Sequence, residues 1–332
     1  MAVHRPFIPV AAFVLISFVM VLYSIDPAAI VEGHRAEVVF HANPIHAAVA
    51  QGMMVLCMLP FASYLLRTGG VHSTLRSSLI VIAVVTLFVA LANVYALKSK
   101  GVWLALAVAL PAQLLYMTTT HGARRRLVVP IGVVAIAVAV TVSFAWHGIW
   151  AATDDTALAV GELWSEVTGS AGVARGVDHM IHNEAAPGGV RERLMLWASA
   201  VLIWAENPIF GKGVAWLIDW QTRVYPDADY SLLHNGYLEI AIRYGVVGLA
   251  FYALLFAWTV RQVWRAKREG IVDPAAFSTY TAVLLFFAIT ILSNSNVRLA
   301  IGESFMWFSA AFGFYCYYRR QQEGRIKVTT WI

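Results

Sequence analysis

His234 and Asn235 stand directly before a long apolar run, in the stretch LLHNGYLEIAIRYGVVGLA of residues 232–250. An imidazole with its ordinary pKa of about 6.5 can take up a proton at neutral pH, so His234 is a candidate general base. A second interpretation is structural: Ser231 or Asn235 caps the helix that follows, and His234 is a neighbour of the cap. The residues by themselves leave both interpretations open.

Glu239 and Arg243 continue the polar pattern on the same predicted helix. Asn235, Glu239 and Arg243 recur at every fourth residue and therefore share one helix face. Because glutamate precedes arginine, the order favours an intrahelical ion pair. Gly245 and Gly248 follow, and they predict close packing within a membrane helix.

Further basic residues are candidates for contact with an anion. Lys98 and Lys100 stand in the short segment LKSKG between two apolar blocks, where snorkelling is the simplest interpretation and a nearby anion the alternative. Arg191 and Arg193 head a helical pattern, although cations at a helix N-terminus oppose its dipole. An anionic partner would compensate, and arginine suits bidentate contact with phosphate.

Metal and nucleotide chemistry have weak support. The histidines His34, His41 and His46 lie in one segment, but their spacing is not that of a metal site and no cysteine or paired carboxylate joins them. The chain also has no Gly-rich nucleotide loop and no G-x-S-x-G elbow. We therefore predict neither a metal nor another cofactor.

The elements that must position these residues are membrane helices. Of the 332 residues, 60% are hydrophobic and only 13% are charged, and the mean hydropathy is +0.68. These values indicate a membrane protein, and blocks of roughly 20 apolar residues suit membrane-spanning helices. Cys57 and Cys316 fall inside such blocks and predict no disulfide. Eight spans are expected, at about 7–24, 45–66, 77–97, 102–119, 127–149, 236–260, 275–293 and 303–318.

The placement of positive charge predicts the topology. With a cytoplasmic start, the cytoplasmic segments hold fourteen Lys and Arg residues, whereas the short outer loops hold only Arg35, Lys98, Lys100 and Arg298. This bias places both termini in the cytoplasm. The formal net charge of +5 is thus a topology signal, and binding to nucleic acid is not expected.

The topology predicts three parts: helices one to five in residues 1–150, an extracytoplasmic module in 151–233, and helices six to eight with a cytoplasmic tail in 234–332. The module contains two helical patterns, TALAVGELWSEVT and RERLMLWASAVLIWAENP, and Pro208 would end the second. The apolar part of this second pattern, Leu194 to Ala205, is too short to span the membrane and suits a helix that lies on or dips into the membrane surface. The segment GSAGVARGVDHMIHNEAAPGG between the two patterns is expected to be flexible.

Four separated motifs resemble the O-antigen ligase and polymerase superfamily. They are VFHANPIHAA (39–48), LKSKGVWLALAVAL (97–110), RERLMLWASAVLIWAENPIFGKG (191–213) and HNGYLEIAIRYGVVG (234–248). The resemblance covers the chain from about residue 35 onward. It implies a GT-C-like all-α fold: a polytopic helical bundle with a long, partly helical periplasmic loop, in the bacterial inner membrane.

The resemblance also implies an activity. Such proteins are inverting, metal-independent glycosyltransferases that move a glycan from undecaprenyl diphosphate to lipid A–core on the periplasmic side. The partners would be this lipid-linked donor, the lipid A–core acceptor and membrane lipid. A polymerase that joins repeat units and a protein O-oligosaccharyltransferase share the motifs. A flippase or transporter would more naturally show charged or broken helices near the membrane midplane in paired halves, and the sequence shows no such pairing.

Roles for individual residues follow from the resemblance. His234 matches the histidine that activates the acceptor hydroxyl, with Asn235 beside it, and Arg193, four residues before Trp197, matches an arginine that engages the diphosphate. Lys100, between Ser99 and Gly101, stands where arginine is usual, and Arg35 precedes the Asn43-Pro44 element. Arg191 is a second candidate for phosphate contact.

The chain departs from the family pattern in three places. Arg243 stands at a commonly acidic position, so that the polar network involving Glu239 differs. Lys100 keeps the usual charge but lacks the bidentate fork of arginine. Only one predicted span precedes the NPIH element, whereas relatives have several.

Overall fold

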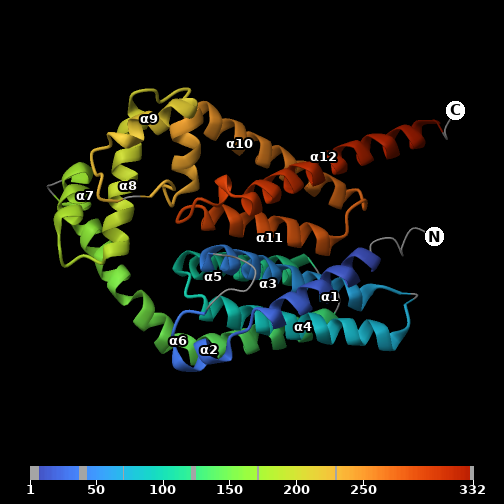
Figure 1. The fold of residues 1–332 in the computed structure, drawn as a ribbon. Helices are drawn as coiled ribbons and strands as arrows, with labels where there is room; N and C mark the ends of the chain where they lie inside the picture. The colour runs from blue at the N-terminus through green and yellow to red at the C-terminus, as the bar shows by residue number, and fades with distance from the viewer. Residues whose placement is uncertain are drawn as a thin grey trace. The chain divides into compact units, whose positions relative to one another are not determined.

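The computed structural model describes residues 7–36, 43–69, 71–120, 125–169, 172–228 and 230–329, so part of the VFHANPIHAA motif, including His41, lies outside the described residues. Within these ranges every regular element is a helix, as predicted (Figure 1). The elements are α1 (Phe7–Tyr23), α2 (Pro27–Glu32), α3 (Pro44–Arg67), α4 (Ser73–Ala96), α5 (Lys100–Thr120), α6 (Arg125–Thr168), α7 (Gly172–His182), α8 (Gly188–Ala205), η1 (Gly213–Ala215), α9 (Trp216–Gln221), α10 (Gly236–Arg268), α11 (Pro274–Thr290), η2 (Asn296–Arg298) and α12 (Ala300–Thr329).

Membrane-spanning helices are present. Among the described residues, α3, α4, α5 and α10 are long and apolar enough to cross a membrane, and α1 and α11 are shorter apolar helices. Each of the eight predicted spans overlaps a helix, but the count of eight and the GT-C-like arrangement stay predictions. The chain is therefore an α-helical membrane protein.

The helices form two compact units. Unit 1 consists of Met1–Trp146, Thr259–Thr290 and Phe308–Ile332, and unit 2 of His147–Trp258 and Ile291–Trp307. The predicted division at residues 150 and 233 follows membrane topology rather than compactness, and it stays a prediction.

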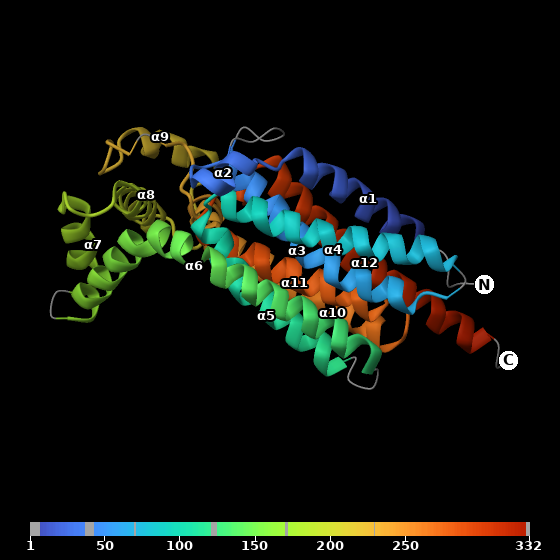
Figure 2. The ribbon, with the colours of Figure 1, turned by 90° about the horizontal axis from the view of Figure 1, so that it is seen from below.

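Unit 1 is built around α3, which packs against α1, α4, α5 and α11 (Figures 1 and 2). Asn43 begins α3, because its side-chain oxygen accepts a hydrogen bond from the backbone N–H of Ile45 at 2.8 Å, and Pro44 follows at the first helical position. At the other end, Arg67 pairs with Asp273 at 2.9 Å, just before α11. Cys57 and Cys316 are both buried and free, as expected.

Unit 2 holds the predicted extracytoplasmic module and the first part of α10. α7 packs on α8, and α8 packs on α9. One cluster in this unit is aromatic and aliphatic and contains Trp216, which is 1% exposed. The buried members are Leu196, Ala200, Ile203, Trp216, Trp220, Ala228, Leu233 and Ile242.

One expectation for this module is confirmed in type and another is wrong. The pattern TALAVGELWSEVT is helical, as expected, but it forms the last part of the longer helix α6, which runs from Arg125 to Thr168. The segment expected to be flexible contains α7 (Gly172–His182). Helix α7 is ordered because Met180 and Ile181 are fully or almost fully buried against Leu194 of α8.

Helix α10 is broken at Gly245, contrary to the prediction of one continuous span. Gly245 has φ of 62° and ψ of −161°, a conformation that side-chain-bearing residues rarely adopt. The two parts of α10 run in different directions (Figure 1). Gly245 is therefore the point at which the backbone changes direction, in addition to the close-packing position that the sequence predicted.

The segment Pro208–Gly213 fills the break. The N–H groups of Val246 and Val247 donate to the carbonyls of Pro208 and Ile209 at 2.9 and 3.1 Å, and the N–H of Lys212 donates to Ile242 at 2.8 Å. Interrupting a membrane helix leaves backbone groups that water cannot satisfy, and this loop satisfies them.

Two glycines make this docking possible. A Cβ atom on Gly245 would lie 2.2 Å from the carbonyl oxygen of Ile209, and one on Gly211 would lie 2.4 Å from the carbonyl carbon of Arg243. Each glycine thus rests directly on the backbone of the opposing segment. The segment Pro208–Gly213, with the pattern Pro-x-x-Gly-x-Gly, and Gly245 of α10 therefore form one contact.

Replacing Gly245 with alanine should lower the free energy of unfolding by at least about 2 kcal/mol, because a positive φ and a steric clash act together. Thermal unfolding of the purified protein in detergent measures this. Gly161→Ala is the matched control, since a Cβ there meets nothing within 4 Å. Equal stability of the two variants would contradict the docking.

Candidate active site

The loop before α10 holds His234 in an unusual backbone conformation. Its φ is 53°, in the left-handed region that few residues other than glycine occupy. Such conformations cost about 1–3 kcal/mol and persist where the surrounding structure enforces them, commonly at functional sites. The half-buried imidazole of His234 is therefore held in place by its neighbours.

The ring of His234 has a defined hydrogen-bonding state. Nδ1 lies 2.9 Å from the carbonyl oxygen of Leu232. A carbonyl only accepts, so Nδ1 carries the hydrogen in the neutral ring and Nε2 carries the lone pair. His234 thus presents a basic nitrogen away from its own backbone.

Asn235 is the cap of α10, which confirms one of the two predicted caps. Its side-chain oxygen accepts hydrogen bonds from the N–H groups of Tyr237 and Leu238 at 3.0 and 3.2 Å. Ser231 has another role, because its carbonyl accepts a hydrogen bond from Arg298 at 3.1 Å. The cap and the candidate base are therefore adjacent residues with separate tasks.

Glu239 connects the segments around His234. The predicted ion pair with Arg243 is confirmed, with Nη1 and Oε2 2.6 Å apart. Oε1 accepts hydrogen bonds from the N–H of Leu233 and the hydroxyl of Ser295, each at 2.8 Å. The side chain of Glu239 has no exposed surface. A buried carboxylate thus fixes the backbone one residue before His234.

Arg298 belongs to the same cluster, and the sequence-based prediction missed it. Its Nη1 lies 3.6 Å from Glu239 Oε2. The guanidinium carbons of Arg243 and Arg298 lie 4.5 and 5.8 Å from the ring centre of buried Trp216. The sequence did offer one signal for Arg298, because it is one of the four basic residues in the predicted short outer loops.

Helix α8 and the His234 loop meet at two aromatic residues, Trp197 of the helix and Tyr230 of the loop. The indole N–H of Trp197 donates to the carbonyl of Leu233 at 2.9 Å. The rings of Tyr230 and His234 meet edge to face with centroids 5.3 Å apart, and the Tyr230 hydroxyl donates to Glu192 at 3.4 Å. These contacts join the Arg-x-x-x-Trp motif to the histidine.

Arg193 lies one helical turn before Trp197 and so shares its face of α8. Burial lowers the pKa of the half-buried guanidinium, and the negative charge of Glu192 opposes this shift. Within the part of the chain that the structure describes, no hydrogen bond or ion pair engages this guanidinium. Arg191 is two residues away, about 200° around the helix axis, and its role in phosphate contact stays a prediction.

A second basic group lies in unit 1. The side chain of Arg35 donates to the carbonyl of Leu97 at 3.1 Å, and Lys98 donates to the carbonyl of Gly33. Burial lowers the pKa of the Arg35 guanidinium. The structure thus brings Arg35 and Lys98, which come from separate motifs, close together.

The Ser-Lys-Gly motif begins helix α5. The carbonyl of Ser99 accepts hydrogen bonds from the N–H groups of Val102 and Trp103 at 3.0 Å each, and Lys100 is the exposed first residue of α5, followed by Gly101. Lys100 and the group around Arg35 belong to unit 1, whereas Arg193, His234 and Glu239 belong to unit 2.

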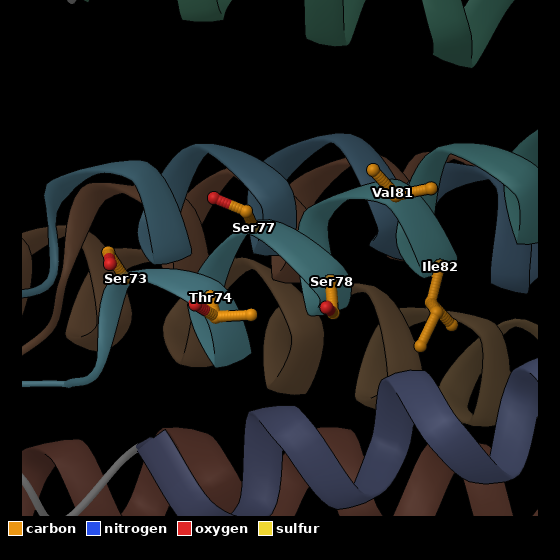
Figure 3. Close-up of a pocket in the computed structure, with 6 residues that line it drawn as sticks. All are labelled: Ser73, Thr74, Ser77, Ser78, Val81 and Ile82. Atoms are coloured by element: carbon orange, nitrogen blue, oxygen red, sulfur yellow. The ribbon is translucent and has the colours of Figure 1, made fainter.

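A pocket along α4 involves none of the predicted residues. It is lined by the hydroxyl-bearing side chains of the first turns and two aliphatic residues beyond them, all on one helix (Figure 3). They are Ser73, Thr74, Ser77, Ser78, Val81 and Ile82.

These features define a class of protein: an α-helical membrane protein that presents an imidazole and an arginine beside apolar helices. Residues 82–253 match the sequence model of the O-antigen ligase family. This segment is more than half of the 332 residues, and the chain belongs to that family. Comparison with curated proteins and with solved structures gives no match.

Membership confirms the resemblance and implies a glycosyltransferase-type activity at the inner membrane. The matched segment contains the Ser-Lys-Gly motif, Arg193, Trp197, His234 and the break at Gly245. Arg35 and Arg298 lie outside it. The matched residues therefore include the loop and helix break that hold His234.

Glu239→Ala should destabilise the protein by about 3–5 kcal/mol, because it removes the carboxylate partner of Arg243, whose side chain is only 13% exposed. Denaturant-induced unfolding in detergent measures the change. Glu323→Ala is the control: Glu323 also pairs with an arginine four residues away, but the side chains are 45% and 40% exposed, so a loss below about 1 kcal/mol is expected. Similar losses for both variants would contradict a central role of Glu239.

Proposed function

We propose that the protein transfers a glycan from undecaprenyl diphosphate to a sugar hydroxyl of lipid A–core at the periplasmic face of the inner membrane. The family supports glycosyl transfer, and the observation that carries the finer proposal is the Nδ1 hydrogen bond of His234. It leaves Nε2 as the base, beside a helix that presents Arg193. The topology, with both termini in the cytoplasm, belongs to this proposal.

The reaction is a single displacement. Nε2 of His234 takes the proton of the acceptor hydroxyl as its oxygen attacks the anomeric carbon. The bond from that carbon to the diphosphate oxygen breaks, and its electron pair leaves with undecaprenyl diphosphate. Attack from the opposite face inverts the anomeric configuration. The proton then passes from the imidazolium to water or to the released diphosphate.

Fixed cations stabilise the leaving group in this proposal. Negative charge develops on the diphosphate, and a preorganised guanidinium such as Arg193 interacts with it more strongly in a partly desolvated site. Lys100, Arg35 and Arg191 are further candidates for the diphosphate. These side chains supply the electrostatic stabilisation that metal ions provide elsewhere, so the proposed reaction uses no metal ion.

The remaining residues position the base. Glu239 holds the N–H of Leu233, Trp197 holds its carbonyl, and Asn235 begins α10. The two peptide groups on either side of the Leu233 Cα atom are thus each held by one hydrogen bond. This anchoring supports the left-handed conformation of His234, which is the next residue.

His234→Ala should lower glycan transfer by a factor of 10² or more, the typical contribution of a general base, while donor binding is retained. Transfer and donor binding are measured separately on the purified protein in lipid vesicles. His182→Ala removes a histidine whose side chain is 68% exposed in the same unit and should leave both unchanged. Transfer at the wild-type rate by His234→Ala would remove the general-base role.

Arg193→Ala is measured in the same two assays and should affect donor binding, unlike His234→Ala. It should weaken donor binding at least tenfold, because one charge-assisted hydrogen bond contributes about 1.5–3 kcal/mol. The exposed Arg175 of α7 provides a control of equal charge, and Arg175→Ala should bind the donor normally. Unchanged binding by Arg193→Ala would remove the diphosphate contact.

A further inference from the structure

The loop that fills the helix break, η1 and α9 together form an exposed apolar surface. Val214, Leu217 and Ile218 are spaced three and four residues apart and so lie side by side on one face. The opposite face of α9 carries Trp216 and Trp220, which are buried. The exposed fractions on the outer face are 59% for Ile209, 72% for Phe210, 86% for Val214, 49% for Leu217 and 70% for Ile218.

This surface carries few charged side chains. Lys212 is the one charged residue in 207–218. Its ammonium pairs with Asp219 at 2.7 Å and with Glu206. An apolar surface of this kind is unusual where a protein faces water.

The surface continues onto a membrane-spanning helix. The backbone bonds from Val246 and Val247 to the loop place Ile209 next to the second part of α10. Val246 and Val247 are about half exposed, and Leu254 further along is 70% exposed. α10 is long and apolar enough to span the membrane, so these side chains form its lipid-facing surface.

The length of α10 after the break sets the depth of the loop. Residues 246–260 contain no charge before Arg261. At about 1.5 Å per residue these fifteen residues cover roughly 22 Å. The hydrocarbon layer is about 30 Å thick. The layer therefore extends past Gly245, to the level at which Pro208–Gly213 is docked.

We infer that the surface formed by Ile209, Phe210, Val214, Leu217 and Ile218 is immersed in the acyl chains of the membrane, in the leaflet next to the N-terminal end of α10. The occupant of this face is lipid hydrocarbon. The loop and α9 thus form a membrane-embedded segment that anchors the break in α10 and the His234 loop above it. The inference does not depend on the proposed transfer reaction.

A fluorescent label at Ile218 tests this placement. Ile218→Cys is labelled with the environment-sensitive dye NBD in the full-length protein and reconstituted into phosphatidylcholine vesicles. Because Cys57 and Cys316 are buried, the introduced thiol is the accessible one. Leu254→Cys on α10 is the lipid-facing reference, and Glu184→Cys, in an exposed turn between α7 and α8, is the water-facing reference.

At Ile218 we expect blue-shifted emission and a loss of intensity with acyl-chain nitroxide lipids comparable to that at Leu254. Val214→Cys should behave in the same way. Emission like that of Glu184 would overturn the inference. Two other results would also overturn it: blue-shifted emission without quenching, which means a protein cover or a second copy, and quenching by headgroup nitroxides alone.

Discussion

A carboxylate without exposed surface must be fully paired, and Glu239 meets this constraint with groups from three separate segments. Its partners are the N–H of Leu233, the hydroxyl of Ser295 and the guanidinium of Arg243, with Arg298 nearby. Removing water makes an unpaired charge very costly, so each of these segments is tied to the others. The position of His234 depends on this arrangement, since Leu233 is its immediate neighbour.

The broken helix is the second constraint, and it explains why two distant motifs occur in one chain. A break in a membrane helix is tolerated only where other groups satisfy its backbone. Pro208–Gly213 supplies those groups, and Gly211 and Gly245 allow the two backbones to touch. Arg243 lies two residues before Gly245, so this docking also fixes its backbone. Its side chain can therefore contact both Glu239 and Trp216.

Local patterns predicted the helices well where length and caps decide the structure. The block expected at 45–66 is α3 (Pro44–Arg67), bounded by the Asn43 cap and by an arginine. Hydropathy did not reveal the break at Gly245. The break depends on a loop more than 30 residues earlier in the sequence, and local hydropathy carries no information on such a contact. Helix α7 was missed for a similar reason, since tertiary burial of Met180 and Ile181 outweighs a glycine-rich composition.

In the candidate site the four-residue spacing predicted the Glu239–Arg243 pair, but Ser295 is 56 residues away from Glu239 and could not be found from spacing. The catalytic roles of His234 and Arg193 stay predictions.

Reconstitution of the wild-type protein with separate acceptors is the most direct measurement of the central claim. Vesicles carry an undecaprenyl-diphosphate-linked glycan and lipid A–core, and no metal ion is added. The account predicts glycan joined to lipid A–core with inverted anomeric configuration, together with released undecaprenyl diphosphate. Lengthened lipid-linked glycan would show a polymerase instead. Bound donor with no transfer to lipid A–core, to a second glycan or to protein would contradict the account.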